Sequence, residues 1–254
     1  MAIPKGVPGE FRPITLKNAL SKIFERVLYG RIHHWIDNRL PDYQFGFRRK
    51  LGCREQLIRL INYLQVEREQ KRVSVVLFLD IRKAYDRVYR KALIAKLYKH
   101  GMRGNMLRMI DRLISNTRCR VLNRGHVSGE YTPSDGIPQG SVLSCLAWNM
   151  NMVDLATPRD ENTMHAAYAD DLASIVSDRD LHTACLRMTQ IYGKIREWAR
   201  FNRVEFNDKK VKAMIIKPRW KRDRKNDKVH TLDSVLYEDS KTRIVRRVEY
   251  VQEY

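Results

Sequence analysis

The sequence is poor in the features that mark secreted and membrane proteins. It has only four cysteines in 254 residues, and no two of them form the C-x-x-C pair typical of zinc or redox sites. Its longest unbroken apolar run, residues 75–79, is far shorter than the roughly eighteen residues of a membrane-spanning helix. The first residues also lack the apolar core of a signal peptide. These absences predict an intracellular protein without disulfides, structural zinc or a membrane partner.

Acidic residues are scarce relative to basic ones. The chain has 49 Lys and Arg against 29 Asp and Glu, which gives a formal net charge of +20. Because the excess is spread along the chain and not confined to a tail, it favours a polyanionic partner. Nucleic acid is the leading candidate, since Lys and Arg gain affinity by releasing the counterions condensed on phosphates.

The chain has no repeat and no linker rich in Gly or Pro, so we expect one continuous unit with internal subdomains. The spacing of apolar residues predicts helices at residues 16–36, 57–64, 92–98, 106–114, 141–155 and 181–198. A buried strand is expected at 75–79, an extended stretch at 117–137, a hairpin from 164–168 and 172–176, and a second hairpin from 235–237 and 243–251.

Three carboxylates lie at the ends of predicted strands. Asp80 closes the strand at 75–79, and Asp170 and Asp171 form the turn of the first hairpin. Taken alone, two adjacent aspartates are more typical of a helix N-cap or a solvated turn. If a sheet brings all three together, however, their mutual repulsion calls for a cation, and oxygen ligands suit Mg²⁺. Two such ions are the arrangement that serves in-line phosphoryl transfer.

A series of segments gives these carboxylates a context. In order, the chain contains IPKGVPGEFRPITL, YQFGFRRKLGCREQL, FLDIRKAYDRV, GIPQGSVLSCLAWNM, AYADDL and FNDKKVKAM. This series resembles the reverse transcriptases of non-LTR (LINE-type) retrotransposons, from residue 3 to about residue 217. FLDIRKAYD, PQGSVLS and YADD are highly specific as a set, although each is only suggestive by itself.

The resemblance implies an α+β, right-hand polymerase fold with fingers and palm, in which the thumb is absent or truncated. It places the fingers at residues 1–72, the first catalytic strand of the palm at 73–90 and a helical insertion of fingers and palm at 91–130. The rest of the palm follows at 131–219, and a basic loop with the start of a primer-grip hairpin occupies 220–254.

The implied activity is RNA-directed DNA synthesis. Such an enzyme adds dNTPs to the 3′-hydroxyl of a DNA primer on an RNA template, with two Mg²⁺ ions, or Mn²⁺ in their place, and releases pyrophosphate. A retrotransposon protein of this kind is expected in the nucleus or cytoplasm of a eukaryotic host.

The resemblance also assigns the metal ligands. Asp80, Asp170 and Asp171 match the catalytic metal-binding triad, and the backbone carbonyl of Ile81 is expected to add a ligand.

Nucleotide contacts follow from the same motifs. Tyr85 matches an aromatic steric gate that would clash with a 2′-hydroxyl and so favour deoxynucleotides. Asp86 is expected to be structural and to point away on a strand-like backbone. Gln139 and Gly140 match the segment that lies along the incoming nucleotide and the template, where Gly permits close backbone approach.

The remaining assignments concern phosphates and template. Lys5 and Arg12 resemble the fingers cations that bind the triphosphate, and Lys210 resembles a lysine that protonates the departing pyrophosphate. Residues expected to support the template strand are Gln44, Phe47 and Arg48.

Two alternatives remain open at this point. The first is a catalytically silent remnant of a mobile element that only binds nucleic acid; the presence of all three acidic positions disfavours it. The second is another templated polymerase, of the group II intron, retron or RNA-dependent RNA polymerase type. Tyr85 argues against the use of ribonucleotides.

Overall fold

A computed structural model of the chain describes residues 2–4, 11–115, 117–123, 125–155, 160, 162–208 and 210–218, and the strands at 236–238, 245–247 and 249–250. Of residues 2–4, 11, 12 and the last three strands it describes the backbone only. The chain divides into two compact units. The first comprises Met1–Pro41 and Lys83–Asp154, and the second comprises Asp42–Arg82 and Leu155–Tyr254.

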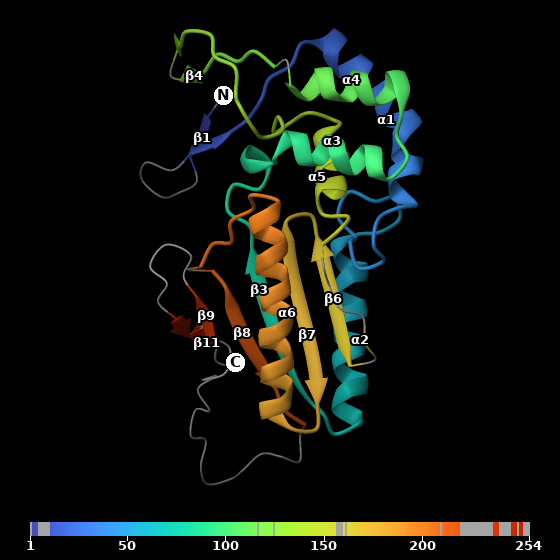
Figure 1. Cartoon of the computed structure of the whole chain (residues 1–254), viewed down its shortest axis with the longest axis vertical. Helices are drawn as coiled ribbons and strands as arrows, with labels where there is room; N and C mark the ends of the chain where they lie inside the picture. Colours follow the sequence, from blue (N-terminus) through green and yellow to red (C-terminus); the bar gives the residue numbers. More distant parts are fainter. Residues whose placement is uncertain are drawn as a thin grey trace. The chain divides into compact units, whose positions relative to one another are not determined.

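The second unit is built on a five-stranded sheet with the order β11-β8-β3-β7-β6 (Figure 1). The central strand β3 runs antiparallel to both β7 and β8, β6 pairs antiparallel with β7, and β11 pairs parallel with β8. The strands are β3 (Val73–Asp80), β6 (Thr163–Tyr168), β7 (Asp171–Asp178), β8 (Lys212–Ile216) and β11 (Glu249–Tyr250).

Helices cover this sheet. The long helix α6 (Leu181–Phe201) packs against β3 and β7, and α2 (Cys53–Glu69) packs against β6 and β3 (Figure 1). Residues 73–77 of β3 are all buried. Because successive side chains of a strand point to opposite faces, both faces of β3 are covered, which explains its unbroken apolar run. The predicted buried strand, the first hairpin and the helix at 181–198 are therefore confirmed.

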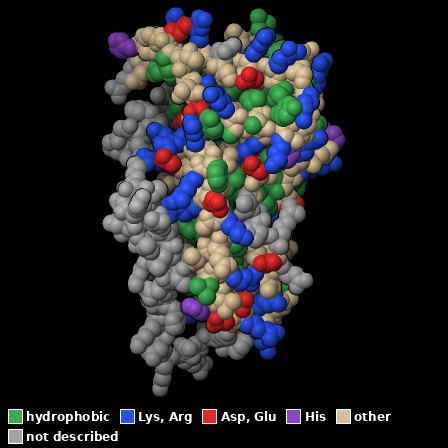
Figure 2. Space-filling view, in the orientation of Figure 1, with side chains coloured by type: hydrophobic (Ala, Val, Ile, Leu, Met, Phe, Trp, Pro, Cys, Tyr) green, Lys and Arg blue, Asp and Glu red, His purple; other side chains and the backbone are tan. Residues whose placement is uncertain are grey.

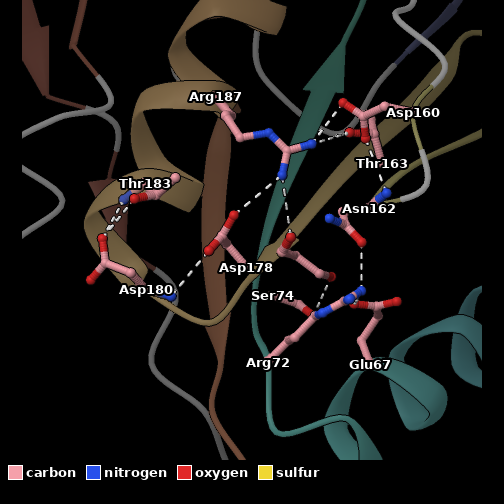
Figure 3. Close-up of polar contacts among 11 residues, drawn as sticks. Glu67, Arg72, Ser74, Asp160, Asn162, Thr163, Asp178, Asp180, Thr183 and Arg187 are labelled. Carbon is pink, nitrogen blue, oxygen red and sulfur yellow. Dashed lines mark hydrogen bonds and ion pairs between the residues drawn. The ribbon is translucent and has the colours of Figure 1, made fainter.

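Polar contacts involving α6 and α2 gather at the end of this sheet where Val73 of β3 pairs with Asp178 of β7, the end opposite Asp80 (Figure 3). Arg187 on α6 forms ion pairs with Asp160 at 2.6 Å and with Asp178 at 3.4 Å. Arg72 pairs with the buried carboxylate of Glu67 at 3.2 Å. These bonds tie α6 and α2 to the sheet at the end opposite Asp80.

The first unit is mainly helical. Its helices are α1 (Ala19–Asp37), α3 (Arg90–Lys99), α4 (Gly104–Ser115) and α5 (Ser144–Asn151), with a 3₁₀ turn at Tyr85–Arg87. Short antiparallel pairs join β1 (Ala2–Pro4) to β2 (Phe11–Pro13) and β4 (Leu122–Asn123) to β5 (His126–Val127). Asn18 caps α1 by accepting a 2.7 Å hydrogen bond from the Ser21 amide. The predicted helices at 16–36, 92–98 and 106–114 are confirmed in this unit, and the one at 57–64 is confirmed by α2 of the second unit.

Two local predictions need correction. The helix expected over 141–155 spans only Ser144–Asn151, because residues 142–143 and 152–154 form turns outside the helical hydrogen-bond pattern. Asp86 lies in the 3₁₀ turn and not on a strand-like backbone. The C-terminal hairpin is confirmed in part: β9 (Leu236–Glu238) pairs antiparallel with β10 (Val245–Arg247), whereas β11 joins the main sheet.

Surface chemistry agrees with the composition. Figure 2 shows Lys and Arg side chains spread over the described part of the visible face. None of the described helices combines the length and apolar character needed to cross a membrane.

Candidate active site

The structure brings the three predicted carboxylates to one end of the main sheet. Asp80 is the last residue of β3 and Asp171 is the first residue of β7. The two are direct partners in the antiparallel register, so their Cβ atoms are about 4.5–5.5 Å apart. Asp170 precedes Asp171 in the turn between β6 and β7. Asp80 and Asp170, which are 90 positions apart in the sequence, thus share one edge of the sheet with Asp171.

The electrostatics of this edge reflect crowding of negative charge. Although Asp171 as a whole is exposed to solvent, its carboxyl group is partly buried. This burial raises the pKa of Asp171, and the negative charges of Asp170 and Asp80 raise the pKa further. Lys210 acts in the opposite direction. A carboxylate whose pKa rises because of like-charged neighbours gains from a nearby cation.

Lys210 lies at this edge as well. Its Nζ donates a 3.1 Å hydrogen bond to Asp80 Oδ1, and its side chain is 63% exposed. The turn that carries it is fixed to the end of β3, because the Asn207 amide donates to the Asp80 carbonyl at 2.8 Å. The amide of Lys210 in turn donates to the Asn207 carbonyl at 2.7 Å. The predicted catalytic lysine is therefore next to the carboxylates, in contact with one of them.

The carboxylates do not form a closed metal cage. Within the described ranges, no three His, Cys, Asp or Glu side chains are arranged so that they could hold a metal ion by themselves. The donor set is nevertheless of the right kind, since carboxylate oxygens are the ligands that Mg²⁺ prefers. Mg²⁺ commonly takes one or two protein carboxylates and completes its shell with substrate phosphates and water.

The acidic turn is held by a buried glutamine. Ala169, which precedes the two aspartates, has a left-handed backbone with φ of 58°. Gln44 donates from Nε2 to the Ala169 carbonyl at 3.1 Å, and its Oε1 accepts from the Ala169 amide at 3.1 Å. The same Oε1 accepts from the Gly46 amide at 2.8 Å. One side chain therefore bonds both backbone groups of the strained residue, which fixes the turn.

These contacts change the role of Gln44. The residue is 1% exposed and its amide is engaged with the backbone, so we no longer expect it to contact a template strand. The sequence motif identified Gln44 as a functional candidate. It could not show that Gln44 bonds Ala169, because the two residues are 125 positions apart in the sequence. Phe47 is 38% exposed, and Arg48 donates to the Gln44 carbonyl at 3.1 Å. Their contact with template stays a prediction.

The predicted steric gate lies in the first unit. The ring of Tyr85 stacks on the indole of Trp148, with ring centroids 5.7 Å apart and an interplanar angle of 27°. Trp148 is fully buried on α5, whereas Tyr85 is half-buried. A fixed indole beneath the tyrosine ring restricts the orientations that the ring can adopt.

Gln139 and Gly140 belong to the same unit. The Gln139 side chain donates from Nε2 to Asp86 Oδ1 at 2.9 Å. The structural role expected for Asp86 stays a prediction. Gly140 has φ of 103°, and a Cβ there would lie 3.1 Å from the Thr15 carbonyl oxygen. The position therefore needs glycine for both its backbone angle and its close contact.

The two predicted triphosphate cations are less well defined. Arg12 is in β2, where it pairs with Ile3 of β1, and only its backbone is described. Lys5 lies outside the described residues, as does the basic stretch at 219–235. Their role in binding phosphate stays a prediction.

Comparison with known proteins agrees with the geometry. Residues 3–243 match the family model described as reverse transcriptase (RNA-dependent DNA polymerase). The chain is 31% identical over 212 residues to the probable RNA-directed DNA polymerase from transposon X-element of Drosophila melanogaster, covering 82% of this chain and 23% of that protein. It is 29% identical over 208 residues to the RNA-directed DNA polymerase from mobile element jockey of the same species, covering 79% and 23%. The chain thus spans about a quarter of the length of these curated relatives.

Solved structures with a similar fold include yeast telomerases. Telomerase of Candida tropicalis in complex with a TWJ fragment of telomeric RNA superposes with a TM-score of 0.60 at 15% identity, covering 85% of this chain and 40% of that chain. The apo enzyme truncated from its C-terminal domain gives a TM-score of 0.59 at 15% identity, covering 86% and 49%. At this identity the likeness establishes the polymerase fold, which confirms the predicted α+β class. The relatives from mobile elements confirm the resemblance to non-LTR retrotransposon enzymes.

Proposed function

Because the chain belongs to the reverse transcriptase (RNA-dependent DNA polymerase) family, we propose that it is the polymerase part of a non-LTR retrotransposon protein. The proposed reaction adds dNTPs to the 3′-hydroxyl of a DNA primer on an RNA template. The observation that carries this proposal is the register pairing of Asp80 with Asp171 beside Asp170. It places carboxylates from two strands at one edge of the sheet, and such carboxylates could hold the divalent cations that assist in-line phosphoryl transfer.

The family uses divalent metal ions, and for this chain the proposed ions are two Mg²⁺, with Mn²⁺ as a substitute. Asp80, Asp170 and Asp171 would hold them, together with the carbonyl of Ile81. The pKa of Asp171, raised by burial and by its acidic neighbours, supports the fit, because a cation would relieve that repulsion. When bound, such ions activate the attacking hydroxyl and stabilise the leaving pyrophosphate. Lys210 would then exchange its bond with Asp80 for a pyrophosphate oxygen.

The other residues of the chain position the substrates. Gln139 and Gly140 would lie along the nucleotide and template, and Lys5 and Arg12 would bind the triphosphate. Support for an RNA partner comes from the charge of +20 and from the likeness to a telomerase bound to telomeric RNA. Phe47 and Arg48 are the proposed template contacts of the second unit. The proposed location is the nucleus or cytoplasm of a eukaryotic host.

Sugar selection gives a test of the gate. In Tyr85→Ala, the loss of the ring should lower the preference for dTTP over UTP by about 10- to 100-fold, the range in which a pocket discriminates by one small group. Tyr85→Phe keeps the ring that stacks on Trp148 and should keep the preference. The measurement is kcat/KM for each nucleotide on poly(rA)/oligo(dT). Unchanged sugar selectivity in Tyr85→Ala would remove the gate assignment.

The proposed activity is tested by primer extension. The folded chain is incubated with poly(rA)/oligo(dT), dTTP and Mg²⁺, and extension of the primer is followed on a denaturing gel. We expect extension that stops when the metal is chelated by EDTA and returns when Mg²⁺ is added in excess. A folded preparation that binds RNA and never extends the primer would favour the silent remnant instead.

A further inference from the structure

Glu25 is a buried charge in the first unit to which the sequence motifs assign no role. It lies on α1 and is 1% exposed. Its Oε1 forms an ion pair with Nζ of Lys17. Its Oε2 accepts hydrogen bonds from the Ser141 hydroxyl and from the Val142 amide, both at 2.9 Å. A carboxylate buried to this degree is retained only where donors satisfy it, so these three contacts define its place.

The bonds of Glu25 hold one side of the Gln139 segment, which we define as residues 136–142. On that same side the Thr15 amide, just before α1, donates to the Gln139 carbonyl at 2.7 Å. The helix that follows the segment, α5, has Leu143 as its N-cap and no side-chain cap of its own. The carboxylate of Glu25 therefore supplies an acceptor ahead of the positive end of α5, from a residue 117 positions away.

The other side of the Gln139 segment is bonded to the turn that carries the steric gate. The Ile137 amide donates to the Tyr85 carbonyl at 2.8 Å, and the Gly136 amide donates to the Val88 carbonyl at 2.8 Å. Gly136 has φ of 87°, and a Cβ there would lie 2.6 Å from the Asp86 carbonyl oxygen. The segment is thus held between α1 and the 3₁₀ turn, with Gln139 bonded to Asp86 by its side chain.

We propose that Glu25 is a positioning residue for nucleotide binding: its carboxylate anchors Ser141 and Val142 and thereby sets Gln139 and Gly140 in register with Tyr85. This inference rests on the proposed function, which places these three residues around the incoming nucleotide. Glu25 touches no substrate in this account. It acts through the segment, and Lys17 balances its charge.

The test uses the full chain with Glu25→Ala and Glu25→Gln. Glu25→Ala removes both bonds to a charged acceptor, so exchange of the Val142 amide with deuterium should accelerate by at least about tenfold. Because a loosened Gln139 segment would hold the nucleotide less well, the KM for dTTP on poly(rA)/oligo(dT) should rise by about tenfold. The kcat should change by less than about threefold, because Glu25 does not touch the reacting atoms. Glu25→Gln keeps an acceptor oxygen and should fall between Glu25→Ala and the unaltered chain in both measurements.

Glu67→Gln is the matched control. Glu67 is also a buried carboxylate, 4% exposed, but it lies on α2 in the second unit, where it pairs with Arg72. It should destabilise its own unit while leaving Val142 exchange and the KM for dTTP unchanged. If Glu25→Ala behaves like Glu67→Gln in both measurements, or accelerates exchange without raising the KM, the inference is overturned. If the unaltered chain extends no primer, the proposed function fails, and unchanged Val142 exchange in Glu25→Ala would reject the anchor separately.

Discussion

Replacing Asp170 by asparagine is expected to slow primer extension by about a thousandfold or more, the scale on which loss of one essential charged group acts in an active site. The change removes one negative charge from the edge formed by Asp80 and Asp171 and so weakens its hold on divalent cations. Affinity for RNA should stay within about twofold, because the basic surface that attracts phosphates is untouched. Single-turnover extension and a filter-binding titration of RNA measure the two quantities.

Asp178→Asn is the matched control for this prediction. Asp178 is a carboxylate on the same strand β7, at the end opposite Asp171, where it pairs with Arg187 (Figure 3). Its loss should leave the extension rate within about twofold, because an exposed or half-exposed ion pair contributes at most about 1 kcal/mol to stability. If Asp170→Asn retains the extension rate of Asp178→Asn, the acidic edge is not the site of catalysis.

Gly46→Ala is expected to be the most destabilising of the small substitutions. A Cβ at this position would lie 2.2 Å from the Ala169 amide nitrogen and 2.8 Å from its Cα. Because backbone cannot yield without moving the acidic turn, we expect the free energy of unfolding to fall by about 3 kcal/mol. For a chain of this size that corresponds to a Tm lower by about 6 to 12 °C in a thermal melt. Extension should fall as well, since Ala169 precedes Asp170.

Gly30→Ala provides a control of the opposite sign. Gly30 is an exposed residue inside α1, and a Cβ there would meet no atom within 4 Å. Alanine should raise the free energy of unfolding by up to about 1 kcal/mol, because it lowers the backbone entropy of the unfolded chain and favours helix. Equal melting temperatures for Gly46→Ala and the unaltered chain would show that the Gln44 turn accommodates a methyl group and that the close packing described above does not constrain the site.

Much of the fold was predictable because its signals are local. The apolar run at 75–79 identifies a strand that is buried on both faces, and the stripe on residues 181–198 identifies the helix that packs on it. The two aspartates of the hairpin turn were recognisable from YADD. That they meet Asp80 could only be expected from their positions at strand ends. The sequence does not give the register that pairs β3 with β7, because this register depends on which side chains are buried together in three dimensions.

The missed features depend on contacts between distant residues. Nothing near Gln44 in the sequence shows that its amide bonds Ala169, and nothing near Glu25 shows that it accepts from Val142. Both residues are polar and fully buried, although polarity alone predicts a surface position. Glu25 also bonds Ser141 and Val142 just ahead of α5, a contact that the spacing of apolar residues does not predict.

The central claim is that Asp80, Asp170 and Asp171 jointly bind divalent cations that act on the nucleotide. Anomalous X-ray scattering from Mn²⁺ tests it most directly, in crystals of the chain bound to an RNA template, a DNA primer and a non-hydrolysable dTTP analogue. We predict anomalous density within about 2.5 Å of the carboxylate oxygens of Asp80 and of at least one of the paired aspartates. An anomalous map with the nucleotide in place and no peak at these carboxylates would contradict the account.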